Sequence, residues 1–261
     1  MPMDYTITVL DQALKLLEVV AKRQNIGLSE LARRTGTTKT LAFRMASTLE
    51  ARGYLLKDEE ERTYSLGYKP LYLSEQMQHH SPLVRIANPF LDDLSERTRE
   101  NVSLFVRDGL ATICLAIRQS PQPIRLYAEL GRQGPLHVGG GPKLLLAFAP
   151  DEIQEAVLAG PLASYTPSTI IDSKRLRSLL KRIRQQGYNI SHGDLDAGAF
   201  SVAAPIRDHG GRVVASLSVA GPQSRLTRDL ESLYLRMLIE AAGEVSAKLG
   251  WHAPAEAPEP V

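Results

Sequence analysis

Cysteine is almost absent from this chain of 261 residues, which contains only Cys114. One cysteine cannot form a disulfide framework within the chain, and alone it cannot build a structural metal site. Cys114 lies in the apolar run ATICLAI, so we expect a buried, unreactive thiol. Apolar runs of the roughly 18 residues that indicate a membrane-spanning helix are missing, and the first residues, MPMDYTITVLDQ, lack the basic and apolar parts of an export signal. We therefore expect a cytoplasmic location and no membrane partner.

Excess charge is scarce as well, because the formal net charge is only +2. The whole chain therefore does not indicate a polyanionic partner. The charge is nevertheless unevenly distributed, since residues 22–57 contain eight Lys or Arg side chains and only two acidic ones, Glu30 and Glu50. A local positive field on a nearly neutral chain suits a nucleic-acid-binding segment. A solvated basic helix face is the simpler alternative.

Helical periodicity and end signals predict three helices before residue 53, over residues 8–24, 29–35 and 37–52. Thr8 and Ser29 are the expected N-caps of the first two. The side chains expected to face the core are Leu10, Leu14, Leu17 and Ala21, then Leu31 and Ala32, then Leu41, Met45 and Leu49. The segments YLL and TYSL then read as two short strands around a charged loop.

The second and third helices, joined by a tight turn at Gly36, match the helix-turn-helix arrangement. Threonine hydroxyls at a helix start suit a phosphate, arginine suits a guanine, and phenylalanine suits a thymine methyl group. The side chains expected at double-stranded DNA are Ser29, Thr37, Thr38, Lys39, Thr40, Phe43, Arg44 and, on the wing, Arg62. The four consecutive acids at 58–61 are expected to point away from DNA or to weaken non-specific binding. A helical hairpin in an ordinary core is the alternative.

The remainder of the chain predicts a mixed α and β domain with a disordered, Pro- and Ala-rich tail. A helix is expected from Pro70, and another from Pro82 that Pro89 bends or interrupts. The expected strands are NVSLFVR and ATICLAIR as a hairpin, PIRLYAEL at 123–130, FSVAAPI and VVASLSVAG. Further helices are expected at GPKLLLAFAP, 151–158, 173–186 and 227–249.

Four sequence blocks resemble the IclR family of bacterial transcriptional regulators, over residues 7 to about 251. They are LSELARRTGTTKTLAFRMASTLEARGYL with its wing and YSLGYKPLYLS, GPLHVGGGPKLLLAF, GYNISHGDLDAGAFSVAAPIRD, and GGRVVASLSVAGP. The third block is the most specific, and its matching positions are Gly187, Ser191, Asp194, Ser201, Val202, Ala203, Ile206, Arg207 and Asp208. It departs from the family pattern at Asp194, where Glu is usual, and at Arg207, where an aromatic residue is usual. Pro142 replaces a usual Gly.

The resemblance implies an α+β protein with a winged helix-turn-helix domain (7–69), a linker helix (70–82), a GAF-like α/β effector-binding domain (83–252) and a disordered tail (253–261). Similar proteins form dimers, often dimers of dimers, and bind pseudo-palindromic operators. We therefore expect a regulator, with no cofactor, whose operator affinity responds to a small organic acid and which controls a catabolic operon. Repression and activation both occur in similar proteins.

The effector pocket that the resemblance implies is formed by Gly140, Gly141, Ser191, Ser201, Ser218 and Ala220. Glycines at 139–141 allow a loop to approach a ligand and present N–H groups, and a helix from Pro142 adds a positive dipole end. The three serines supply hydroxyl donors without charge, which suits a small aromatic or 2-oxo acid. A plain flexible turn and structural core hydroxyls are the alternatives, and Lys143 either pairs with the ligand or is solvated.

An enzyme is the second hypothesis, with the helix-turn-helix serving only as an interaction surface for a catalytic or metabolite-binding domain. The segment SHGD holds Ser191, His192 and Asp194, but near neighbours in one loop rarely form a triad, and G-x-S-x-G is missing. No H-x-x-x-H spacing occurs, so His137 with His192 is the candidate metal-binding pair, and solvated or hydrogen-bonded imidazoles are the simpler alternative. We therefore expect no catalytic and no metal site.

Overall fold

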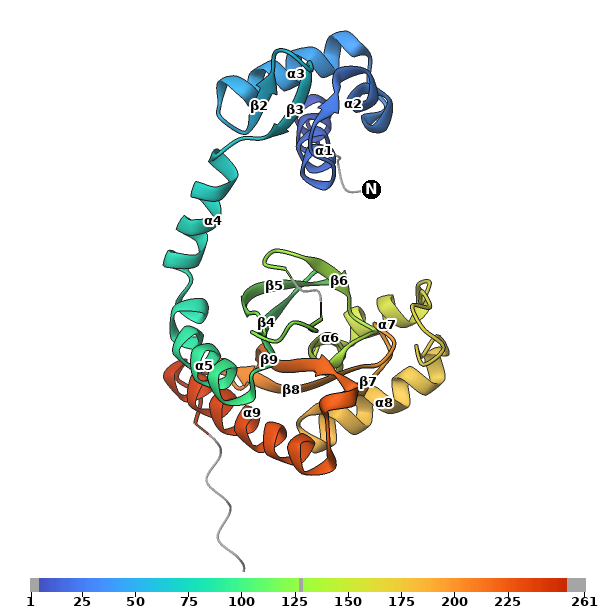
Figure 1. The fold of residues 1–261 in the computed structure, drawn as a ribbon. Coiled ribbons are helices and arrows are strands. Elements are labelled where there is room, and N and C mark those ends of the chain that lie inside the picture. The colour runs from blue at the N-terminus through green and yellow to red at the C-terminus, as the bar shows by residue number, and fades with distance from the viewer. Residues whose placement is uncertain (1–4, 127–128, 253–261) are drawn as a thin grey trace, which may run out of the picture. The chain divides into compact units, whose positions relative to one another are not determined.

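A computed structural model describes residues 5–126 and 129–252, so the tail expected to be disordered lies outside the described residues. The chain divides into two compact units, residues 1–80 and 81–261 (Figure 1). Each unit has its own hydrophobic core. Within the described ranges, no helix is both long enough and apolar enough to cross a membrane.

The N-terminal unit is a helical cluster with a small antiparallel sheet. Its elements are α1 (Thr8–Lys22), β1 (Ile26–Gly27), α2 (Leu28–Thr35), α3 (Lys39–Ala51), β2 (Leu55–Asp58), β3 (Thr63–Leu66) and α4 (Lys69–His80). The strands pair in the order β1-β3-β2. The β2–β3 hairpin is the expected wing, while the two-residue β1 is too short to leave an alternating pattern in the sequence.

The face that α1 buries differs from the expected one. Leu16 and Val20 are fully buried, whereas Leu10 and Leu14 are 55% and 52% exposed. Apolar side chains surround most of this helix, so two stripes fit helical spacing equally well and periodicity alone cannot choose between them. Its expected cap at Thr8 is also wrong, because the helix begins at Thr8 and is preceded by Ile7, which makes no side-chain cap bond.

The turn between α2 and α3 forms as expected at Gly36, which takes a left-handed conformation with φ of 66°. Ser29 is not the N-cap of α2, because that helix starts one residue earlier and Gly27 precedes it. Thr38 caps α3, and its hydroxyl accepts a hydrogen bond from the Leu41 N–H at 3.2 Å. The core side of α3 is centred on Ala42, with the expected Leu41 and Leu49 only half-buried.

The C-terminal unit is built on a six-stranded antiparallel sheet with the order β6-β5-β4-β9-β8-β7. Its elements are α5 (Pro82–Thr98), β4 (Asn101–Asp108), β5 (Ala111–Arg118), β6 (Gln133–Pro135), α6 (Gly140–Ala147), α7 (Asp151–Ala159), α8 (Ser173–Gln186), β7 (Asn189–His192), β8 (Ala199–Arg207), β9 (Val213–Pro222), the short η1 (Gln223–Arg225) and α9 (Arg228–Lys248). The helix α5 runs without interruption through Pro89.

Two expectations about the sheet are wrong. The described residues of 123–130 form no strand, and the edge strand is β6, ten residues after Pro123. The segment that contains Ser191 is not a loop but the strand β7, which pairs with β8. Both are edge strands of three or four residues, too short for a clear alternation of apolar and polar residues.

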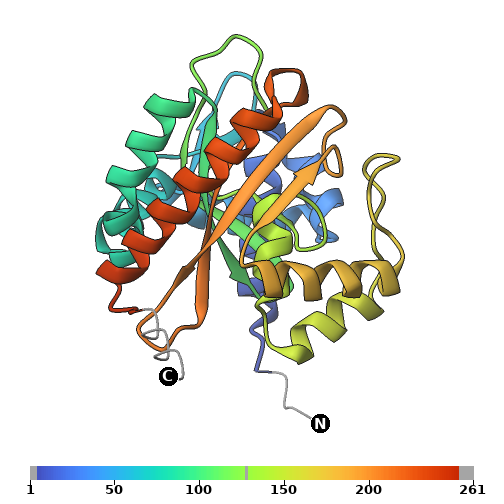
Figure 2. The ribbon, with the colours of Figure 1, turned by 90° about the horizontal axis from the view of Figure 1, so that it is seen from below.

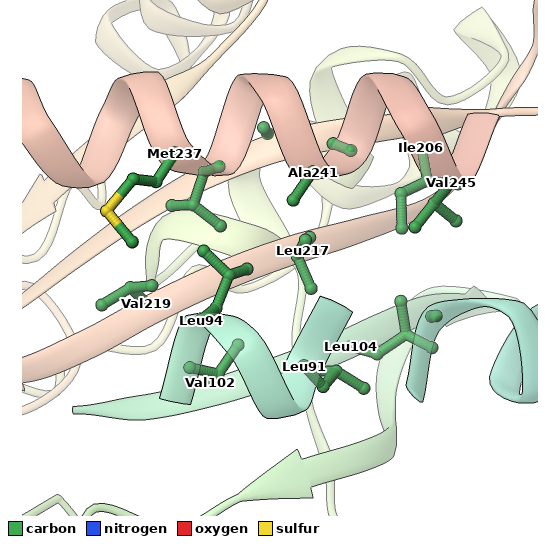
Figure 3. Packing of buried hydrophobic residues seen from close by; sticks show 14 of the residues in the cluster. Leu91, Leu94, Val102, Leu104, Ile206, Leu217, Val219, Met237, Ala241 and Val245 are labelled. Atoms are coloured by element: carbon green, nitrogen blue, oxygen red, sulfur yellow. The ribbon is translucent and has the colours of Figure 1, made fainter. Parts of the chain in front are cut away.

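Helices cover both faces of this sheet. Figure 2 shows α5 and α9 on one side and α7 and α8 on the other. Leu217 and Val219 of β9 pack with Leu91 of α5 and Met237 of α9 in the larger core (Figure 3). Because side chains alternate along a strand, the intervening Ser216, Ser218 and Ala220 face the opposite layer. This alternation gives the α6 side of the sheet a polar surface.

Arg207, which replaces the usual aromatic residue, lies between two aromatic rings. Its guanidinium carbon is 5.0 Å from the Phe148 ring centroid and 5.7 Å from that of Trp251. Its Nη1 also donates to the Gly211 carbonyl at 3.0 Å. The side chain therefore connects the β8–β9 hairpin to the end of α6 and to the segment that follows α9.

We expect Arg207→Ala to lower the free energy of unfolding by about 1–2 kcal/mol, because a half-buried guanidinium stacked on two rings is lost. Arg207→Phe should recover part of this loss by packing against the same rings. Urea denaturation measures both. Arg212→Ala is the control, because the Arg212 side chain is 79% exposed and, among the described residues, forms an ion pair only with Asp208. Equal effects at positions 207 and 212 would contradict the stacking role.

Candidate functional site

The helix α3 presents one polar, cationic face. Lys39, Thr40, Phe43 and Arg44 are exposed, and Phe43 is 50% exposed. Within the described residues Lys39 and Arg44 have no ion-pair partner. Because neither side chain is held in an internal ion pair, each can bind a nucleic-acid phosphate or base without first breaking a contact.

Other cations of the N-terminal unit are already paired. Arg23, Arg33 and Arg34 all approach Glu30 Oε1, at 2.9, 3.6 and 2.9 Å. The hydrogen bond from Arg34 holds the pKa of Glu30 below its usual range, supported by the charges of all three arginines and opposed by a smaller effect of desolvation. The positive field of residues 22–57 is therefore concentrated at α3 more strongly than the sequence count indicates.

The threonine hydroxyls at the turn mainly form hydrogen bonds within the helix-turn-helix motif. The Thr35 hydroxyl donates to the Leu31 carbonyl at 2.8 Å, so the 2.9 Å contact between the Thr35 and Thr37 hydroxyls is donated by Thr37. The Thr38 hydroxyl oxygen accepts the capping hydrogen bond, so its hydrogen is still available to be donated. Of the two, only Thr38 still has a donor to offer a phosphate.

The wing tip is built by an acidic residue. Asp58 Oδ1 accepts the N–H groups of Glu60 and Glu61 at 2.9 and 3.0 Å, which closes the turn between β2 and β3. Arg62 follows in a left-handed conformation with φ of 54° and is exposed. Ser29 is likewise exposed, at the second position of α2.

A cavity of about 270 Å³ lies in the C-terminal unit, on the polar side of the sheet. Of the six predicted effector residues, five line it: Gly140, Ser191, Ser201, Ser218 and Ala220. Strand pairing places three of them in one row, because Ser191 lies opposite Ser201 and Ser201 lies opposite Ala220. Asn101 extends the row on β4.

The glycines after His137 do not form a loop as predicted. Gly139, with φ of 80°, precedes α6, while Gly140 and Gly141 are its first two residues. A Cβ on Gly140 would lie 2.5 Å from Ser201 Oγ, and one on Gly141 would lie 2.8 Å from Ser216 Oγ. These glycines let the helix start lie directly on the sheet. Gly141 faces Ser216 beneath the helix and does not line the cavity.

Lys143 is neither solvated nor directed at the cavity. Its Nζ lies 2.5 Å from Asp194 Oδ2 and 3.1 Å from Ser191 Oγ, and both charged side chains are at least 92% buried. Burial alone would raise the pKa of Asp194. The Lys143 charge and the hydrogen bonds from Lys143, Ser191 and Gly139 outweigh it and hold this pKa below its usual range.

Asp194 also orders the backbone around the cavity. Its Oδ1 accepts the Gly139 N–H at 3.1 Å, immediately before α6. Its main-chain carbonyl accepts the Thr169 hydroxyl at 2.7 Å, and the neighbouring Gly193 carbonyl accepts that of Thr166 at 2.6 Å. The Asp194 carboxylate thus holds the start of α6, and the main-chain carbonyls of Gly193 and Asp194 tie the β7–β8 loop to the segment before α8.

Further lining residues come from β4 and β5, which the sequence analysis did not assign to the site. They are Asn101, Ser103, Thr112 and Cys114. Cys114 is buried as expected, and burial raises the pKa of its thiol to about 11. Polar residues at alternating positions in NVSLFVR and ATICLAIR were the available signal.

The histidines form neither a triad nor a metal site. Ser191 and His192 are consecutive on β7 and point to opposite sides, and exposed His192 contacts Gln223 at 2.8 Å and Glu231 at 3.2 Å. Buried His137 instead contacts the Ala163 carbonyl at 2.9 Å. In the part of the chain that the structure describes, no group of three or more potential metal-ligating side chains is gathered.

Two family models match this chain. The model of the bacterial transcriptional regulator IclR C-terminal domain matches residues 75–247, and that of the IclR helix-turn-helix domain matches residues 9–59. The chain belongs to the IclR family. The family of DNA-binding transcriptional regulators that the sequence blocks resemble is thereby confirmed, as is the combination of a helix-turn-helix unit with an α/β unit.

Several IclR-family members are similar over nearly their whole length. The regulator KipR of Bacillus subtilis is 32% identical over 241 residues, which cover 92% of this chain and 96% of KipR. The structure of an IclR regulator from Alicyclobacillus acidocaldarius has a TM-score of 0.86 at 26% identity, covering 94% of this chain and 100% of that one. An IclR homologue from Microbacterium hydrocarbonoxydans, complexed with 4-hydroxybenzoate, has a TM-score of 0.81 at 26% identity and covers 92% and 98%.

Proposed function

We propose that this IclR-family protein binds an operator through α3 and that a small organic acid in the C-terminal cavity changes its operator affinity. The observation that carries the proposal is the presence in one chain of an exposed cationic face on α3 and a cavity of about 270 Å³ that serine side chains help to line. A ligand that binds better to one of two arrangements of the protein shifts their populations. Control of a catabolic operon is part of the same proposal.

The expected DNA contacts follow the exposed face of α3. Arg44 reads a guanine, Phe43 contacts a thymine methyl group, and Lys39 with Thr38 contacts phosphates. Thr40 is expected at the base edges beside Arg44 and Phe43, and Ser29, Thr37 and Arg62 are expected backbone contacts. Thr37 has the weakest support, because its hydroxyl hydrogen goes to Thr35.

An organic acid is supported by two serine hydroxyls of the cavity and by a relative. The cavity-lining hydroxyls of Ser201 and Ser218 can donate to a carboxylate, and so can N–H groups at the start of α6. The 4-hydroxybenzoate complex of the Microbacterium homologue supports a ligand of this class.

Self-association is supported by exposed apolar side chains on the N-terminal unit. Val9, Leu10 and Leu14 of α1 are each more than half exposed, and α4 buries none of its residues while exposing Leu71 by 70%. We propose that a second copy of the chain covers these faces, so that two α3 helices read the halves of a pseudo-palindromic operator. A dimer of dimers is the larger assembly that fits the same operator symmetry.

We expect Leu10→Glu with Leu14→Glu to shift the protein toward monomers, because charge on a buried face opposes association. Sedimentation velocity should show the dimer dissociation constant rising by about 100-fold. Exposed Ile239→Glu on α9 is the matched control, and it should leave the assembly unchanged. An unaltered dimer in the α1 variant would exclude this face.

The test of the proposed function is binding to DNA from upstream of the gene at physiological salt, against unrelated competitor DNA. A panel of small carboxylic acids is then added. Retention on the specific fragment, with one acid changing the affinity, is the expected result. Binding equal to competitor DNA, lost steeply as salt rises, reflects phosphate contacts alone and contradicts the proposal.

A further inference from the structure

At the β7–β8 loop, the cavity is lined by the Asp194 carboxylate but not by its counter-ion, the Lys143 ammonium group. Asp194 lines the cavity, whereas Lys143 does not. Asp194 Oδ1 accepts hydrogen bonds from Gly139 and Ser191, and Oδ2 accepts one from Lys143. A carboxylate has about four acceptor positions, so one position remains, on Oδ2. A ligand at this end meets an acceptor and not the ammonium group.

The neighbouring Ser191 also has only an acceptor to offer. The Lys143 ammonium cannot accept a hydrogen bond, so the single hydroxyl hydrogen of Ser191 goes to Asp194 Oδ1 at 2.5 Å. Asp196, which lines the same end, adds a second negative charge. This end therefore repels a carboxylate, which corrects the role of Ser191 as a donor to one.

The serines on β8 and β9 have the opposite property. Ser218 is 1% exposed, lines the cavity, and its hydroxyl has no hydrogen-bond partner among the described residues. Ser201, which is only partly buried, also lines the cavity, and its hydroxyl beside the first residue of α6 likewise has no hydrogen-bond partner among the described residues. Both hydroxyl hydrogens are free to be donated. Among these side chains, the donors on β8 and β9 are thus separate from the acceptors at the β7–β8 loop.

We propose that the effector is an organic acid that also carries a hydrogen-bond donor, a hydroxyl or an ammonium group, and that Asp194 is the residue that reads this donor. The inference rests on the proposed organic-acid function and narrows its ligand class. The acid group lies toward Ser201 and Ser218, and the donor group reaches Asp194 Oδ2. Lys143 acts as a positioning residue that keeps this carboxylate ionised and oriented.

The test uses matched acids and the full-length protein. Calorimetric titrations compare butyrate with 3-hydroxybutyrate and 3-aminobutyrate, and benzoate with 4-hydroxybenzoate. We expect at least one donor-bearing acid to bind about 10-fold or more tightly than its unsubstituted partner, because its hydrogen bond goes to a charged acceptor. Comparing the hydroxy acids with the amino acid shows which donor group Asp194 binds. Equal binding of all partners overturns the inference while leaving the organic-acid proposal intact.

Variants distinguish recognition of the ligand's donor group by Asp194 from a general effect on the packing of the cavity. The double variant Lys143→Gln with Asp194→Asn removes both buried charges, so the preference should fall to about 3-fold, since a neutral hydrogen bond is about half as strong. Ser201→Ala should weaken both members of a pair equally and leave the preference unchanged. A preference that survives the double variant undiminished overturns the role of Asp194. If no acid binds while specific operator binding persists, the organic-acid proposal fails and this inference with it.

Discussion

Replacing Lys39 and Arg44 with alanine together is expected to weaken binding to the specific operator by about 100-fold or more. An arginine that reads a guanine contributes roughly 1–3 kcal/mol of discrimination, and losing a phosphate contact lowers affinity for all sequences. Both side chains lie on the exposed face of α3 and have no ion pair among the described residues. Their removal therefore costs the fold little, and the loss appears in DNA binding.

The measurement is fluorescence anisotropy with the operator fragment over a range of salt concentrations. The double variant should lose specificity, and its plot of log affinity against log salt should be shallower by about one phosphate contact. Arg33→Ala with Arg34→Ala is the matched control, because both arginines already contact Glu30. A larger loss in the control than in the α3 variant would place the recognition face elsewhere.

The same pair of variants decides between the two classes of function that the sequence left open. If α3 is only an interaction surface for an enzyme or a metabolite-binding module, Lys39 and Arg44 can be removed without loss of function. If the protein acts at an operator, the variant keeps its fold and its ligand affinity but loses regulation. Circular dichroism and ligand titration of the same variant separate these outcomes.

The parts of the fold that the sequence predicted well are those with strong local signals. Gly36 ends α2, α5 begins at Pro82, and 173–186 is a helix with the expected boundaries. The wrong assignments have physical causes of another kind. The buried face of α1 was predicted wrongly because apolar residues surround the helix. The edge strand β6 was misplaced because three residues are too few to show an alternation of apolar and polar side chains.

The site was predicted in part, for a related reason. Serines on alternating strand positions are visible in a sequence, and five of the six predicted residues line one cavity. The partner of Lys143 is 51 residues away in the chain, and only tertiary packing brings the two together. The same holds for Gly141, whose neighbour is Ser216 beneath the helix. Spacing along a chain cannot reveal such contacts.

The second large effect is expected at the buried ion pair. Lys143→Met should lower the free energy of unfolding at pH 7 by about 3–5 kcal/mol, because it leaves the Asp194 carboxylate buried without its cation. The two side chains are only 5% and 8% exposed, so water cannot replace the lost partner. Arg177→Met is the control. Its pair with Glu155 is about half exposed, so solvent can replace the lost partner and the stability should change far less.

The pH dependence distinguishes this explanation from a simple packing defect. The pKa of Asp194 is lowered in the folded protein. Its ion pair therefore stabilises the fold above the unfolded pKa of about 3.9, and this contribution is lost as pH falls through the lower folded value. In Lys143→Met the cation is gone, burial raises the pKa of Asp194, and the carboxyl becomes neutral at a higher pH.

The destabilisation of the variant should thus be largest near pH 7 and shrink as the solution is acidified. Urea denaturation of both proteins from pH 7 to about 4 measures the difference, and a difference that stays constant with pH would mean that lost packing, not an unpaired charge, destabilises the variant.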